Sequence, residues 1–222
     1  MVTSQSPNMS DYEVERREFR LDVPEFFNFA ADVIDKYAQN PDKEAILWIG
    51  QHGEERHLTF AHFSEASGRA ANAFAALGLG KGDPVLVMLP RIPEWWETIL
   101  GLMRLGAIPI PCTTLLTTKD IQIRSEVAEA RAFITDQEGA HKFDQVRDQC
   151  PTITQTVLIA GGGSDTVFRE NWTDYYTITV QASPTFTGPK TRSDDPCLVY
   201  FTSGTVGYPK MVCVTVGHSL RT

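Results

Sequence analysis

The chain has 222 residues, enough for one large domain or two small ones whose core needs no disulfide or metal to hold it together. Hydrophobic residues make up 42% of it and charged residues 22%, which argues against a wholly disordered chain. Lys and Arg number 20 and Asp and Glu 28, and the resulting formal charge of -8 argues against a general nucleic-acid binder.

The beginning of the chain is polar and then mixed in charge. Acidic residues lie among the first 20, and no hydrophobic stretch there is typical of a signal peptide. We therefore expect residues 1–22 to form an extended or flexible arm. No apolar run has the length that spans a bilayer. The four widely spaced cysteines are interpreted as reduced, mostly buried small hydrophobes of a cytoplasmic protein: Cys112, Cys150, Cys197 and Cys213.

The first predicted elements follow this arm. Hydrophobic residues at helical spacing predict a helix over 28–39. Two apolar runs, 45–49 and 56–59, flank a glycine-containing turn and predict a hairpin. Thr59 is expected to cap a longer helix that ends at Gly78. The glycines of 78–82 follow that helix rather than a strand, so they indicate a helix end and a turn rather than a dinucleotide-binding loop.

Strands and helices then alternate along the chain. We predict strands at 85–89, 107–110, 132–134 and 157–159. We predict helices that begin at Pro93 and that cover 118–128 and 139–149. This alternation predicts an α/β fold with a mostly parallel sheet flanked by helices. Residues 181–196 are rich in Pro, Thr, Ser and Asp and predict a surface connection.

A polar loop joins two short apolar strands that are predicted at 197–201 and 211–214. Its residues are Thr202, Ser203, Gly204, Thr205, Val206, Gly207, Tyr208, Pro209 and Lys210. Glycines let backbone N–H groups approach an anion closely, hydroxyls donate hydrogen bonds, and the lysine adds positive charge. We interpret the loop as a cradle for polyphosphate rather than a plain hairpin loop. It differs from a Walker A loop, in which a helix follows the lysine.

This loop carries a family resemblance. Residues 199–210 resemble the signature loop of the AMP-binding, adenylate-forming superfamily, with Val206 where that family usually has Thr or Ser. Residues 58–63 and 103–111 are similar to two further elements of the superfamily, with His62 where Glu is common. Three more segments are most similar to the medium-chain acyl-CoA synthetases, which take medium-chain fatty acids or aryl acids: 25–30, 93–97 and 115–121.

The resemblance implies the N-terminal subdomain portion of the adenylate-forming synthetase fold, with residues 23–222 a partial AMP-binding domain cut after the phosphate loop. In that family the loop holds the β- and γ-phosphates of ATP. The substrate carboxylate attacks the α-phosphate, and CoA then displaces AMP to give the thioester. The resemblance places the ligand of Mg²⁺ and the adenine, acyl and CoA contacts downstream, so we expect this chain to be inactive alone.

Two other hypotheses remain open at this point. The gene product could end near Thr222 as a short non-catalytic binding or assembly module derived from a synthetase. Val206 and Val214 depart from the family pattern and slightly favour this hypothesis. A small P-loop nucleotide-binding protein would require a helix directly after Lys210.

Several other residues have a structural interpretation. Trp96 lies at helical spacing with Ile99 and is interpreted as core rather than as a stacking platform. Glu94 and Glu97 could form an acid pair, but on the first turn of a helix they are expected to complement its dipole. The histidines show no metal-ligand spacing: His52, His57, His62, His141 and His218.

Overall fold

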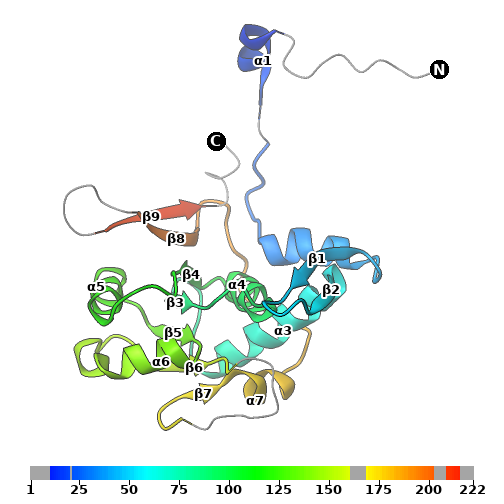
Figure 1. Cartoon of the computed structure of the whole chain (residues 1–222). Helices are drawn as coiled ribbons and strands as arrows, with labels where there is room; N and C mark the ends of the chain where they lie inside the picture. Colours follow the sequence, from blue (N-terminus) through cyan, green and yellow to red (C-terminus); the bar gives the residue numbers. More distant parts are fainter. Residues whose placement is uncertain (1–10, 21, 161–168, 203–208, 216–222) are drawn as a thin grey trace.

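The computed structural model describes residues 11–20, 22–160, 169–202 and 209–215. Its centre is a five-stranded parallel sheet with the strand order β4-β3-β5-β6-β7 (Figure 1). The strands are β3 (Pro84–Met88), β4 (Ile108–Pro111), β5 (Ala132–Thr135), β6 (Gln155–Leu158) and the short β7 (Thr173–Asp174). The predicted α/β class with a mostly parallel sheet is confirmed.

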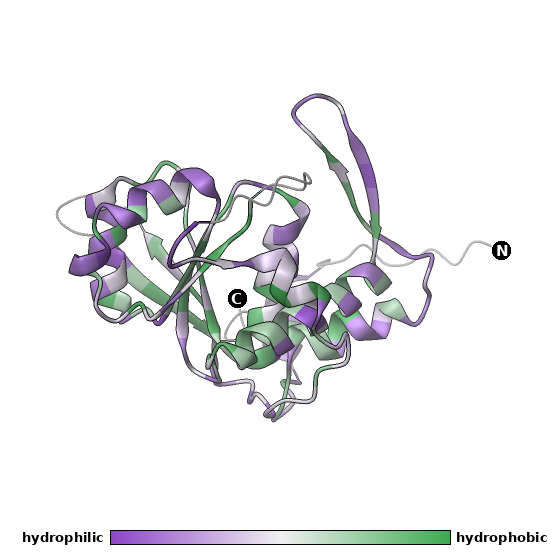
Figure 2. Cartoon of the chain, turned by 90° about the horizontal axis from the view of Figure 1, so that it is seen from below, coloured by the Kyte–Doolittle hydropathy of each residue, from purple (hydrophilic) through white to green (hydrophobic). Residues whose placement is uncertain are grey.

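Helices cover both faces of this sheet. On one face lie α3 (Phe60–Ala76), α4 (Pro93–Leu105) and α7 (Tyr175–Val180). On the other lie α5 (Thr118–Ala128) and α6 (Gln137–Asp144), which is followed by the short 3-10 helix η2 (Arg147–Gln149). Figure 2 shows the strands of this sheet as largely hydrophobic, whereas hydrophilic residues lie on the outer surfaces of the helices.

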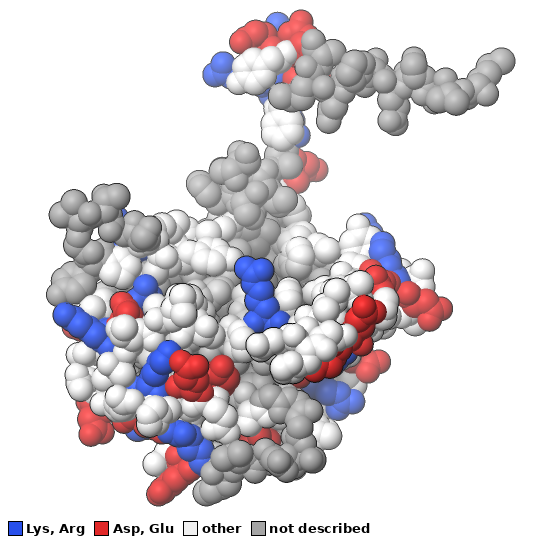
Figure 3. Space-filling view, viewed as in Figure 1, with Lys and Arg blue, Asp and Glu red and all other residues white. Residues whose placement is uncertain are grey.

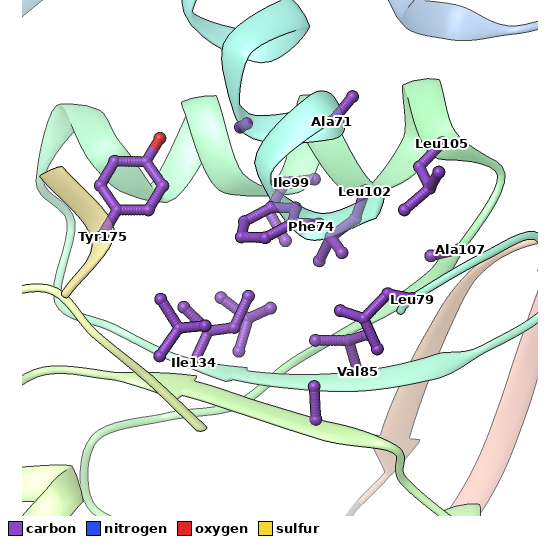
Figure 4. Packing of buried hydrophobic residues seen from close by; sticks show 14 of the residues in the cluster. Ala71, Phe74, Leu79, Val85, Ile99, Leu102, Leu105, Ala107, Ile134 and Tyr175 are labelled. Atoms are coloured by element: carbon purple, nitrogen blue, oxygen red, sulfur yellow. The ribbon is translucent and has the colours of Figure 1, made fainter. Parts of the chain in front are cut away.

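The run of apolar residues in β3 is explained by burial on both faces. Val85 and Val87 belong to the core cluster with Phe74 of α3 and Leu102 of α4 (Figure 4). Leu86 and Met88 belong to the opposite cluster, together with residues of α5 and α6. Successive side chains of a strand point to opposite faces, so a strand between two helix layers needs apolar residues at every position.

The N-terminal region packs beside these layers. It contains the π-helical η1 (Phe29–Ile34), α2 (Asp35–Ala38) and an antiparallel hairpin of β1 (Glu44–Ile49) and β2 (Glu55–Thr59). The predicted helix and hairpin are therefore confirmed. Within the segment predicted as an arm, α1 (Tyr12–Glu18) has no buried residue and stands apart from the body (Figure 1).

The helix ends form as the residue types predict. The Thr59 hydroxyl accepts a hydrogen bond from the backbone N–H of His62 at 3.1 Å, which caps α3. Gly78 follows α3 with a φ of 86°, a left-handed conformation that glycine adopts without strain. Pro93 is the first residue of α4. These caps fix where the two long helices begin and end over the sheet.

A second antiparallel hairpin stands at the β4 edge of the molecule. Its strands are β8 (Pro196–Thr202) and β9 (Lys210–Thr215), and it is separate from the parallel sheet. The sequence did not predict β7 and α7, because two and six residues are too few to show a period. Beyond α7, the connection that ends at β8 is irregular, as predicted, apart from a bridge between Phe26 and Arg192.

Candidate functional site

The hairpin brings the two ends of the predicted phosphate loop together. Thr202 is the last residue of β8 and Lys210 the first of β9, and the two face each other in the register. The Thr202 hydroxyl donates to the Lys210 carbonyl at 3.4 Å. Both residues are exposed, while Pro209 is half-buried. The other predicted site residues lie outside the described residues: Ser203, Gly204, Thr205, Val206, Gly207 and Tyr208.

The element that follows the lysine separates this site from a Walker A loop. A Walker A lysine is followed directly by a helix whose N-terminus faces the phosphates. Here β9 begins at Lys210 and pairs with β8. The P-loop hypothesis, which required a helix at this point, is therefore wrong, and the predicted strand is confirmed.

Two side chains of β8 hold the hairpin to the body. Val199 is 4% exposed and lies in the cluster of the α5–α6 face, where Ile110 of β4 and Ile121 of α5 are also buried. Phe201 packs against the same cluster, and the guanidinium of Arg124 lies 5.3 Å from its ring centroid. Tyr200, which lies between them in the strand, is exposed, as the alternation of a strand requires.

The beginning of β8 is held by an ion pair. The ammonium of Lys81, in the turn after α3, lies 2.7 Å from the carboxylate of Asp195. The hydrogen bond from Lys81 holds the pKa of Asp195 below its ordinary value. Asp195 also accepts from the backbone N–H of Arg192 at 2.6 Å. The loop is thus carried by a strand that is attached to the body near both ends.

The outer face of the hairpin is apolar. Tyr200 and Val212, which pair in the register, are each more than two-fifths exposed on this face. Figure 3 shows a mostly uncharged surface around the hairpin, while acidic and basic residues alternate on the lower part of the same face. The only charged side chain that β8 and β9 present at the described mouth of the loop is Lys210.

A largely buried polar cluster among the described residues lies elsewhere, and the sequence did not predict it. Glu94 and Glu97 of α4 are 7% and 8% exposed; Glu94 lies on the first turn of the helix, as predicted, whereas Glu97 lies beyond it. Glu97 accepts from the Tyr175 hydroxyl at 3.1 Å and lies 2.9 Å from Nε2 of His62. Glu94 accepts from the Tyr176 hydroxyl at 3.1 Å.

We call this cluster of Glu94, Glu97, His62, Tyr175 and Tyr176 the acid–tyrosine layer. Burial raises the pKa of Tyr175, and the neighbouring Glu97 raises it further, so the hydroxyl keeps its proton and donates it. Figure 4 shows this hydroxyl directed away from the apolar side chains of the cluster. The layer joins α3, α4 and α7. The three-residue spacing of Glu94 and Glu97 places them on one helix face, but nothing local in the sequence names their partners.

The remaining predicted residues are placed as follows. Trp96 is half-buried against the cluster below the β1–β2 hairpin, which agrees with a packing role. His57 pairs with Glu44 rather than with His62.

All four cysteines are unpaired, but Cys150 alone is buried and Cys213 is exposed, so the expectation that most are buried is wrong. No described helix has the length and apolarity needed to cross a bilayer.

Comparison with solved structures defines the class of protein. An acyl-CoA synthetase of Brucella canis superposes with a TM-score of 0.78 at 26% identity, over 93% of this chain and 36% of that one. The anthranilate CoA ligase AuaEII, in complex with anthranoyl-AMP, has the same fold, with a TM-score of 0.76 at 23% identity over 88% of this chain and 36% of its own. The fold is that of the adenylate-forming ligases.

The chain belongs to the AMP-binding enzyme family, whose sequence model matches residues 34–222. The human mitochondrial acyl-coenzyme A synthetase ACSM1 is 37% identical to it over 97% of this chain and 36% of the relative. Human ACSM3 is 35% identical over 96% of this chain and 37% of the relative. Rat ACSM5 is 39% identical over 86% of this chain and 33% of the relative. The chain therefore spans about a third of the length of the curated relatives it matches, and the predicted resemblance is confirmed.

The expected cytoplasmic location is wrong. The relatives ACSM1, ACSM3 and ACSM5 are all named as mitochondrial proteins. The expectation depended on unpaired cysteines, and a reduced thiol indicates a reducing environment without telling one reducing compartment from another.

Proposed function

We propose that the protein to which this sequence belongs is an ATP-dependent acid–thiol ligase, an acyl-CoA synthetase. In the first step a carboxylate oxygen of the acid attacks the α-phosphorus of ATP, and pyrophosphate leaves. In the second step the sulfur of CoA attacks the acyl carbon, and AMP leaves. Membership of the AMP-binding family and similarity to acyl-coenzyme A synthetases along nearly the whole chain support this proposal.

We propose that the loop between β8 and β9 holds the β- and γ-phosphates of ATP. Lys210 would supply positive charge, and Thr202, Ser203 and Thr205 would donate hydroxyl hydrogen bonds. Gly204 and Gly207 would present backbone N–H groups, while Val206, Tyr208 and Pro209 complete the loop. Phosphoryl transfer needs positioning and charge neutralisation more than covalent help, and these residue types supply both.

One observation carries the assignment of the loop. The hairpin register places Thr202 and Lys210 opposite each other at the open end of two strands, both exposed to solvent. A hydroxyl and an ammonium group at the mouth of a glycine-rich loop are what a polyphosphate chain requires. Elsewhere on β8 and β9 the described residues are uncharged, so the site has a local positive charge within a protein of formal charge -8.

The remaining partners follow from the reaction. We propose a medium-chain fatty acid or an aryl acid as substrate, CoA as acceptor and the mitochondrion as the location. Mg²⁺ would accompany ATP. Among the described residues no three His, Cys, Asp or Glu side chains gather in a way that could hold a metal ion, so its acidic ligand is proposed to lie elsewhere. Residues 23–222 would form part of the AMP-binding domain and residues 1–22 an arm that precedes it.

Replacing Lys210 by alanine in the full-length protein tests the site. We expect acid-dependent exchange of pyrophosphate into ATP to fall on the order of 100-fold, because one positive charge is lost where negative charge must be held. Lys36→Ala, at an exposed position of α2 on another part of the surface, is the matched control and should leave exchange unchanged. Unchanged exchange in Lys210→Ala would rule out the role assigned to the lysine.

The substrate class is tested separately. Straight-chain acids of increasing length and aryl acids are offered side by side to the full-length protein, and thioester formation is measured. We expect medium-chain or aryl acids to give the highest kcat/KM. Preference for acetate or for long-chain acids would contradict the proposed substrate class while leaving the ligase reaction in place.

A further inference from the structure

The inference concerns Arg124, which joins α5 to the hairpin next to the proposed phosphate loop. Its guanidinium lies 5.3 Å from the ring centroid of Phe201, within the range of a cation–π contact. Phe201 directly precedes Thr202, the residue at the mouth of the loop. Figure 1 shows α5 below the end of the hairpin where β8 finishes. Arg124 is therefore a charged residue of the body that contacts β8 one residue before the mouth of the loop.

The charge of Arg124 is only weakly neutralised by its own helix. Its side chain is 14% exposed, and its acidic partner among the described residues is Asp120, whose carboxylate lies 3.4 Å away and whose backbone carbonyl accepts from the same nitrogen at 3.2 Å. Asp120 is already used by the helix cap, because its other carboxylate oxygen accepts from the Thr117 hydroxyl at 2.7 Å and from the Thr117 N–H at 3.0 Å. The hydrogen bonds from Thr117 lower the pKa of Asp120. Because both contacts to Asp120 are made by one guanidinium nitrogen, the rest of the planar group remains available to stack on the ring.

The register of the hairpin determines how Arg124 can act. Thr202 pairs with Lys210 and Phe201 pairs with Met211. Side chains of neighbouring residues in a strand point to opposite faces, so Phe201 lies on the face toward α5 while Thr202 and Lys210 lie on the other. Arg124 therefore does not share a face with the lysine and acts on the loop through Phe201.

We propose that Arg124 is a positioning residue for the phosphate loop, because its stack on Phe201 fixes the end of β8 from which the loop departs. α5 begins a few residues after β4, at the carboxyl edge of the parallel sheet where α/β proteins bind ligands. The stack thus sets the place of the Thr202–Lys210 pair relative to that edge. This proposal rests on the proposed function of the loop.

The chain offers a matched control for this contact. Arg147 makes the same kind of stack, with its guanidinium 4.9 Å from the Phe143 ring centroid and 5.4 Å from that of Trp172. Those two rings belong to the same buried cluster as Val199, but neither belongs to β8 or β9. Arg124→Met and Arg147→Met remove the same charge and retain a similar apolar stem.

The first readout is kinetic, in the full-length protein. Arg124→Met should raise the KM for ATP about fivefold, the change expected from one cation–π contact, while the KM for the acid stays constant. Arg147→Met should change neither. Phe201→Leu should raise the KM for ATP as Arg124→Met does, and the double variant should add little to either single change. An unchanged KM for ATP in Arg124→Met, or fully additive effects, would overturn the proposal.

The second readout does not depend on activity. Hydrogen exchange of peptides from β8 and β9 is measured by mass spectrometry in the wild type and both arginine variants. Faster exchange in these strands for Arg124→Met alone supports the proposal, and equal rates in the two variants overturn it. If the wild type shows no acid-dependent pyrophosphate exchange, the proposed function fails. The hydrogen-exchange measurement then still decides whether Arg124 positions the hairpin.

Discussion

The acid–tyrosine layer and the β8–β9 hairpin contain similar kinds of residues in opposite environments. In the layer, Glu94 and Glu97 are almost fully buried and accept hydrogen bonds from tyrosines of α7. In the hairpin, the ammonium of Lys210 is exposed at the mouth of the loop, and the Thr202 hydroxyl makes only a long contact of 3.4 Å to the Lys210 carbonyl. The difference teaches that polar side chains stabilise a fold when their partners come from the protein, and are available to a ligand when they do not.

The largest expected effect on stability belongs to the layer. Glu97→Ala should lower the free energy of unfolding by about 3 kcal/mol, because the Tyr175 hydroxyl and His62 lose their buried acceptor. Urea denaturation measures this change in the free energy of unfolding. Glu65→Ala removes an exposed acid from the adjacent helix α3 and should change stability by less than about 0.5 kcal/mol. Equal losses in the two variants would mean that the bonds of the layer contribute nothing.

A smaller effect is expected where the hairpin meets the body. Val199→Ala removes two buried methyl groups and should cost about 2 kcal/mol. Val212→Ala is the natural comparison, since that side chain is 44% exposed on the partner strand and should cost little. The same urea experiment distinguishes them. If Val212→Ala were as costly as Val199→Ala, the outer face of the hairpin would be covered in the protein.

The smallest effect depends on pH. Lys81 holds the pKa of Asp195 below its ordinary value of 3.8. A carboxyl whose pKa is depressed by folding stabilises the native state above its unfolded pKa, and this contribution is lost as the pH falls through the folded pKa. Asp195→Asn should therefore cost less than about 1 kcal/mol at neutral pH, since the pair is partly exposed.

The comparison of Asp195→Asn with the wild type is repeated at a pH below the folded-state pKa. There the two proteins should have the same stability, because the wild-type carboxyl is protonated and no longer attracts Lys81. A difference that persists in acid would show that the ion pair is not its source.

Much of this architecture is predictable from local sequence. The continuous apolar run at 85–89 indicated a strand buried on both faces, and Thr59, Gly78 and Pro93 indicated helix ends that form at those residues. The strand after Lys210 was also predictable, and it separates this loop from a Walker A loop. Caps, turns and periodicity act over a few residues, so the sequence carries them without reference to the rest of the fold.

The candidate site was only partly predictable for a different reason. The residue types of 202–210 indicated an anion, but nothing local in the sequence showed that Arg124 would stack on Phe201 or that Lys81 would hold Asp195. The same limit explains why the partners of Glu94 and Glu97 were not predicted. A helical acid on the first turn is solvated in most proteins, and here α7 covers it with two tyrosines that lie about 80 residues away in the chain.

The sequence by itself determined the α/β class, the strand–helix order, the family and the chemical character of the loop, because these follow from residue type, spacing and a contiguous motif. The tertiary structure alone decided which polar groups are buried and which remain free. It also decided how the hairpin is held to the sheet and which side chain contacts the strand beside the loop. These properties depend on contacts between segments far apart in the chain, and no local pattern encodes them.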